Sequence, residues 1–197
     1  MRPVTMLLRS ILAAACGFAL VGAALGEAPI TPRASYPNYG SGSCACAAAE
    51  DVLSANGYPQ EAERWRSRQS GILTIDPQTP YPSMVDLAER RGLRYAYTVD
   101  GDEAFLAWCS RSRLAAVIYW PPYAGYSPVK GRRVPRPNNE AIHAIAFFGF
   151  DTRSGDAWVL DNNEPNKLRL IPRADFLAAW RLVGGQAWTV LPPPALQ

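Results

Sequence analysis

The chain has 197 residues, of which 48% are hydrophobic and 19% are charged, a composition typical of a single globular domain. Its formal net charge is only +3, and nearly all of its basic residues are arginines. This balance excludes a strongly basic nucleic-acid-binding surface and strong electrostatic attraction to a membrane, so we expect no nucleic-acid partner.

The first 26 residues have the layout of a secretory signal peptide. Arg2 and Arg9 form a positive n-region, and the apolar run 11–24 is too short for a comfortable transmembrane helix. Residues 24–26, Ala-Leu-Gly, form a small-x-small cleavage site. The sequence therefore predicts a signal peptide over residues 1–26.

Cleavage there would leave residues 27–197 as one exported domain, periplasmic or secreted, with no stable membrane span. A competing interpretation is a lipoprotein anchored through Cys16, but apolar residues continue well beyond this cysteine, which argues against it. The compartment would be oxidising, and the cysteines left are Cys44, Cys46 and Cys109. Because their number is odd, one thiol stays free or pairs outside the chain. A Cys46–Cys109 bridge would satisfy this, although the sequence does not fix the connectivity.

The first predicted helix follows a Gly/Ser-rich turn. Residues 45–56 contain strong helix formers, and Gly57 followed by Pro59 is a stop signal. Cys44 therefore lies in the first turn, where unpaired backbone N–H groups and the helix dipole favour a thiolate and lower its pKa. A nucleophilic sulfur is expected at such a position.

Other side chains of this helix have plainer interpretations. Cys44 and Cys46 are also compatible with small buried apolar residues or with halves of a disulfide. Cys46 is expected to pack or pair instead of reacting, and Glu50 and Asp51 are expected to be exposed.

The remaining elements follow in chain order. A second helix begins at Pro59, residues 74–82 form a proline-interrupted loop, and Ser83 caps a helix over 84–91. A strand is predicted over 93–99, followed by a helix after Asp102. Four strands come next, over 114–120, 142–150, 157–161 and 167–171, and then a helix over 172–181 and a strand over 186–191. This order predicts an α+β fold with N-terminal helices packed on a mostly antiparallel sheet.

Residues 121–140 are a long segment with no helix or strand pattern. They hold several prolines and a basic patch over 130–136. Loops of this length are more often functional than idle, so this segment, with Trp120, Tyr123 and Tyr126, is a candidate substrate or partner surface; a solvated insertion is the alternative.

His143 is the only histidine in the chain, so any imidazole chemistry depends on it. It opens an apolar strand, and the following hairpin returns Asp161 to the same end of the adjacent strand. This geometry suits an acid or amide that holds an imidazole in one tautomer. The alternatives are a core or surface histidine and an ordinary Asp-Asn-Asn turn. One histidine and one close cysteine pair do not make a structural zinc site, so no metal is expected.

These pieces together resemble the papain-like cysteine peptidases of the bacterial C39-like type. The resemblance rests on Asn38, on Cys44 at the start of a helix that ends in Gly57, on His143 with Gly-Phe-Asp at 149–151, and on Asp161. It extends over residues 38–191 and includes the helix, strand, helix, strand succession of the central region.

The resemblance implies a papain-like fold, a peptide or protein substrate and no cofactor. In it Cys44 is the nucleophile, His143 transfers the proton, Asp161 orients His143, and Asn38 donates to the oxyanion. The family usually has Gln where Asn38 stands, and Gly-Pro or Gly-x after the nucleophile where this chain has Ala-Cys. Asn162 and Asn163 remain alternative orienting residues.

The sequence thus predicts an exported thiol hydrolase that cleaves peptide or amide bonds by a Cys-His-Asp mechanism. Two alternatives stay open. One is transglutaminase-like or amidase-like acyl transfer on the same scaffold, and the other is a catalytically inactive papain-fold binding domain. These patterns predict neither the identity of the substrate nor an oligomeric state.

Overall fold

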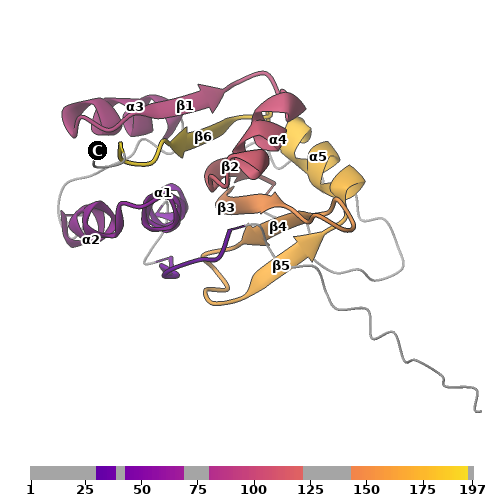
Figure 1. Cartoon of the computed structure of the whole chain (residues 1–197), viewed down its shortest axis with the longest axis horizontal. Coiled ribbons are helices and arrows are strands. Elements are labelled where there is room, and N and C mark those ends of the chain that lie inside the picture. Colours follow the sequence, from indigo (N-terminus) through magenta and orange to yellow (C-terminus); the bar gives the residue numbers. More distant parts are fainter. Residues whose placement is uncertain (1–29, 39–42, 69–79, 122–142, 195–197) are drawn as a thin grey trace, which may run out of the picture.

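The computed structural model describes residues 30–38, 43–68, 80–121 and 143–194 (Figure 1). The predicted signal peptide and almost all of the loop over 121–140, with its basic patch, lie outside these residues. Within them, no helix is both long enough and apolar enough to cross a membrane.

Five helices and six strands make up the part of the chain that the structure describes. The helices are α1 (Cys44–Ala55), α2 (Pro59–Arg68), α3 (Pro80–Arg90), α4 (Glu103–Arg111) and α5 (Arg173–Leu182). The strands are β1 (Tyr95–Thr98), β2 (Ala116–Trp120), β3 (His143–Phe150), β4 (Ala157–Leu160), β5 (Leu168–Ile171) and β6 (Ala187–Val190).

All six strands form one sheet in the order β1-β6-β2-β3-β4-β5, and every neighbouring pair is antiparallel. The last strand, β6, lies between β1 and β2, so the C-terminal segment is an inner strand that joins β1 to the rest of the sheet (Figure 1). The predicted α+β class, with N-terminal helices packed on an antiparallel sheet, is confirmed.

Helices cover both faces of the sheet, with α1 and α2 on one side and α4 and α5 on the other (Figure 1). Side chains of β2 alternate between the two layers. Val117 and Tyr119 pack with α1, α2 and α3, whereas Ile118 and Trp120 pack with α4 and α5. Because both faces are buried, β2, and β3 after His143, are continuous apolar runs with no polar alternation.

The start of α3 differs from the prediction. The helix begins at Pro80, so Ser83 lies inside it and is not its cap. Proline is tolerated in the first turn of a helix, where its missing N–H would have no helical partner. Pro80 and Pro82 therefore belong to the first turn of the helix and not to a preceding loop.

The expectation that Glu50 and Asp51 are exposed is wrong, because both are at most 1% exposed. Glu50 forms an ion pair with Arg66 of α2 at 2.9 Å, and Asp51 accepts the backbone N–H of Tyr36 at 2.8 Å. Burial, with a smaller contribution from the charge of Glu50, raises the pKa of Asp51 to about 8. The acids thus anchor the N-terminal segment and α2 to α1.

Asn56 fixes the other end of α1. Its Nδ2 donates to the carbonyl oxygens of Ala115 and Val190 and to Oγ1 of Thr189, and its Oδ1 accepts the N–H of Ala115. Both ends of this buried amide are therefore hydrogen bonded, and they attach the C-terminal end of α1 to β2 and β6.

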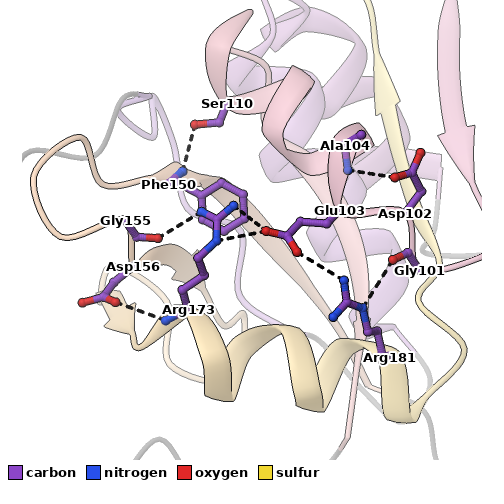
Figure 2. A network of polar contacts seen from close by, with 10 residues as sticks. All are labelled: Gly101, Asp102, Glu103, Ala104, Ser110, Phe150, Gly155, Asp156, Arg173 and Arg181. Carbon is purple, nitrogen blue, oxygen red and sulfur yellow. Dashed lines mark hydrogen bonds and ion pairs between the residues drawn. The ribbon is translucent and has the colours of Figure 1, made fainter.

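Figure 2 shows the ion-pair network that joins α4 to α5. The carboxylate of Glu103, at the start of α4, accepts hydrogen bonds from both Arg173 and Arg181 of α5 (Figure 2). The Arg173 guanidinium also lies 3.8 Å from the centroid of the Phe150 ring. Partly exposed ion pairs each contribute little to stability, but together these contacts hold α5 against α4 and the end of β3.

Two glycines meet beside this network. A Cβ atom on Gly185 would lie 2.2 Å from the Cα of Gly101, and Gly185 has a φ of +62°. Gly92, after α3, has nearly the same φ, +63°, but open space around it. The two positions therefore differ in steric contact and not in backbone conformation.

We expect Gly185→Ala to lower the free energy of unfolding by more than about 3 kcal/mol, because backbone must move to admit the methyl group. Gly92→Ala, the matched control, should cost about 1 kcal/mol from the positive φ alone. Urea denaturation followed by circular dichroism measures both. Equal losses in the two variants would contradict the close contact.

Asp51 predicts a pH dependence of stability. Its folded pKa of about 8 lies above that of an unfolded aspartate, so the folded state binds the extra proton. The free energy of unfolding should therefore fall as the pH rises through the range from about 4 to about 8. Asp51→Asn should remove this contribution. The free energy of unfolding of the variant minus that of wild type, measured by urea denaturation, should therefore increase with pH across that range. A pH-independent difference would contradict the assignment.

Candidate active site

Cys44 is the first residue of α1 and is partly buried. The backbone N–H groups of Ala45, in its own helix, and of Ala144, in β3, donate hydrogen bonds to its sulfur. Its thiol is also hydrogen bonded to the ring of His143. The helix start and the start of β3 therefore converge on one sulfur atom.

His143 is the first residue of β3 and is 9% exposed. Its Nε2 lies 2.8 Å from Oδ1 of Asp161, which follows β4 and is buried. Because Nε2 faces Asp161, the other ring nitrogen, Nδ1, is the one left for the sulfur of Cys44. The structure thus brings together the three side chains that the sequence predicted to meet.

The electrostatics of this group favour separated charges. Burial alone would raise the pKa of the Cys44 thiol, but the hydrogen bond and positive charge of His143, with the two backbone N–H groups, outweigh it and lower the pKa. Burial would likewise lower the pKa of His143, but Asp161 and Cys44 outweigh it and raise the pKa to about 9. These contacts therefore stabilise a thiolate beside an imidazolium.

Asn38 lies next to Cys44, His143 and Asp161. Its backbone N–H donates to the carbonyl oxygen of Asn162 at 2.8 Å, and its Nδ2 donates to Oδ1 of Asn163 at 2.9 Å. Its Oδ1 accepts the hydroxyl of Ser43, the residue before the cysteine. An amide nitrogen carries two hydrogens, so Nδ2 keeps one donor beyond its bond to Asn163.

The two alternative orienting residues lie in different places. Nδ2 of Asn163 is 3.3 Å from Nε2 of His143, and its backbone N–H donates to Oδ1 of Asp161 at 2.9 Å. Nδ2 of Asn162 instead donates to the carbonyl oxygen of Cys44 at 2.8 Å. Of the two, Asn163 is the one in hydrogen-bond range of the imidazole.

Two aromatic residues of β2 lie opposite the start of β3. Trp120 pairs with His143 and Tyr119 pairs with Ala144. Trp120, predicted to belong to a surface with Tyr123 and Tyr126, is 3% exposed and stacks on Phe176 at 5.6 Å, so it belongs to the core. Tyr123 and Tyr126 lie outside the described residues.

Tyr119 is a neighbour that the sequence did not identify. Its hydroxyl is buried and has no hydrogen-bond partner among the described residues. Burial, and to a smaller extent the charge of Cys44, raise the pKa of Tyr119 well above its usual range. Only its position near the end of a buried run signalled it, and such a position normally indicates a core residue.

No disulfide bond joins any two of Cys44, Cys46 and Cys109. Cys46 packs in the core on the α1 side of the sheet, and Cys109 packs in the core on the α4 and α5 side. The bridge between Cys46 and Cys109 considered from the sequence is therefore not formed. Burial raises the pKa of Cys109 to about 12, which makes this thiol unreactive. Within the described ranges, no cluster of His, Cys, Asp and Glu could hold a metal ion.

Comparisons with known proteins find likenesses among solved structures only. No family model matches the chain, and no curated protein matches it. Among solved structures, the chain is similar to one described as a "putative C39-like peptidase from Bacillus anthracis", with 17% sequence identity and a TM-score of 0.43. The match covers 57% of this chain and 58% of that one. At this identity and TM-score, the match assigns no activity to this chain.

The lowered pKa of Cys44 predicts its reactivity. We expect iodoacetamide to alkylate Cys44 at lower pH than an ordinary thiol. His143→Ala should slow the reaction at pH 6, because loss of the imidazole raises the pKa of the thiol and lowers its thiolate fraction. Mass spectrometry of the Cys44 peptide measures the rate. Cys46 and Cys109 should stay unmodified in the folded protein. A His143→Ala profile identical to that of wild type would contradict the ion pair.

Proposed function

We propose that this protein is an exported thiol hydrolase that cleaves peptide or amide bonds. The observation that supports it most is the unbroken chain of contacts from the Cys44 thiol to the His143 ring and on to the Asp161 carboxylate. A thiol with a lowered pKa beside an imidazole with a raised pKa is what nucleophilic catalysis by cysteine requires.

In the proposed reaction, the Cys44 thiolate attacks the acyl carbonyl carbon and forms a tetrahedral oxyanion. His143 then gives its proton to the leaving amine, and a thioester to Cys44 remains. His143 next takes a proton from water as the water attacks this thioester, and the carboxylate product leaves. Asp161 keeps the ring aligned through both steps.

Asn38 and the backbone N–H of Cys44 are the proposed donors to the oxyanion. Asn38 is supported by its remaining amide hydrogen and by its bond to Ser43, which brings it beside the cysteine. Donors of this kind act because they are already oriented where the charge develops. The mechanism uses only side chains and backbone of this chain.

The sharpest test is labelling by an epoxysuccinate probe, which traps an activated cysteine. Wild type and Cys46→Ala, the matched control, should be labelled, whereas Cys44→Ala should not and His143→Ala should be labelled much more slowly. Cleavage of a peptide library should fall by about 10³-fold or more in Cys44→Ala. Labelling that persists in Cys44→Ala and disappears in Cys46→Ala would identify Cys46, and not Cys44, as the nucleophile.

Product analysis separates hydrolysis from the acyl-transfer alternative. Release of a free carboxylate supports hydrolysis, and incorporation of an added amine supports transfer. A binding domain without activity would instead leave Cys44 unlabelled, with an ordinary thiol pKa.

A further inference from the structure

Asn162 has no role in the mechanism proposed above, yet it contacts two of its members. Its side chain is 1% exposed, and its Nδ2 donates to the carbonyl oxygen of Cys44 at 2.8 Å. Its own carbonyl oxygen accepts the backbone N–H of Asn38 at 2.8 Å. One residue therefore joins the nucleophile's backbone to the proposed oxyanion donor.

The hydrogen bonding of Asn162 differs from that of a structural asparagine. Asn56 is also buried, and both ends of its amide are bonded. Asn162 leaves its Oδ1 buried with no hydrogen-bond partner in the described part of the chain. An unpaired buried acceptor costs folding free energy, so stability alone does not account for this amide.

The bond to Cys44 is not needed to satisfy the helix. A carbonyl in the first turn of an α-helix already accepts the N–H four residues later. A second donor at this carbonyl instead fixes how the start of α1 sits against the turn that carries Asp161. Displacement of a nucleophile by about 1 Å can reduce a rate about a hundredfold.

We propose that Asn162 is a positioning residue that holds Cys44 and Asn38 at a fixed separation from the Asp161–His143 pair. It acts through the backbone of Cys44 and of Asn38 and does not touch the substrate. This inference rests on the proposed function of Cys44 and His143, but its test includes a measurement that needs no substrate.

The test compares Asn162→Ala and Asn162→Leu with Asn56→Ala. The leucine variant nearly restores the volume of the side chain without its donor, which separates the hydrogen bond from packing. Asn56 lies about 18 Å along α1 from Cys44 at 1.5 Å per residue, so its loss affects stability away from the site. The readouts are kcat, KM and the pH profile of Cys44 alkylation by iodoacetamide, all per folded molecule.

We expect both Asn162 variants to lose about 10- to 100-fold in kcat with KM changed less than about twofold, and to move the alkylation profile of Cys44 to higher pH. Asn56→Ala should unfold at lower urea concentration but keep the wild-type kcat and profile. Wild-type kcat and profile in both Asn162 variants would overturn the inference, and so would an equal shift in Asn56→Ala.

Failure of the two proposals can be told apart. If wild type hydrolyses no peptide but the Asn162 variants still move the alkylation profile, the proposed function fails and the positioning role of Asn162 is supported. If wild type hydrolyses peptides and the Asn162 variants match it in both readouts, the hydrolase stands and the positioning role is overturned.

Discussion

The candidate site depends on one short turn, Asp161–Asn163, at the end of β4. Asp161 contacts the imidazole, Asn162 contacts the backbone of Cys44 and Asn38, and Asn163 contacts the side chain of Asn38. The strand register places this turn. Ala146 pairs with Leu160, and the same register continued three residues brings Asn163 level with His143. An antiparallel hairpin thus aligns three consecutive polar residues with every other member of the site.

Burial has opposite consequences in two parts of α1. At its start, the Cys44 thiol is partly buried, but an imidazole and two N–H groups favour its charge, so its pKa falls. About two turns further on, Asp51 is buried with a single N–H donor and a like charge beside it, so its pKa rises to about 8. The same low-polarity surroundings therefore favour an ion at one position and a neutral acid at the other. The number and charge of the hydrogen-bonding partners decide which form is favoured.

Local patterns in the sequence predicted most elements and the meeting of Cys44, His143 and Asp161. This was possible because a helix start and a hairpin are short-range features with fixed geometry. The burial of Glu50 and Asp51 and the position of Trp120 were missed, since each depends on partners far along the chain. The position of β6 between β1 and β2 could not be predicted, because the periodicity of a strand does not indicate which strands it will pair with. Asn162 likewise looks like an ordinary turn residue until the turn is folded against α1.

The members of the site are held by different forces. Cys44 and His143 begin elements that are buried in the core, α1 and β3, so packing fixes them. Asn38 belongs to an extended segment that is attached by hydrogen bonds from its neighbours Tyr36 to Asp51 and Glu63, and by its own bonds to the turn. Tyr36 of this segment packs in the core, but Asn38 lies beyond it and outside the core. Local opening free energy is lowest where few apolar contacts hold a residue. The spacing of thiol and imidazole should therefore survive perturbations that already displace the oxyanion donor, which makes that donor the more sensitive part of the proposed machinery.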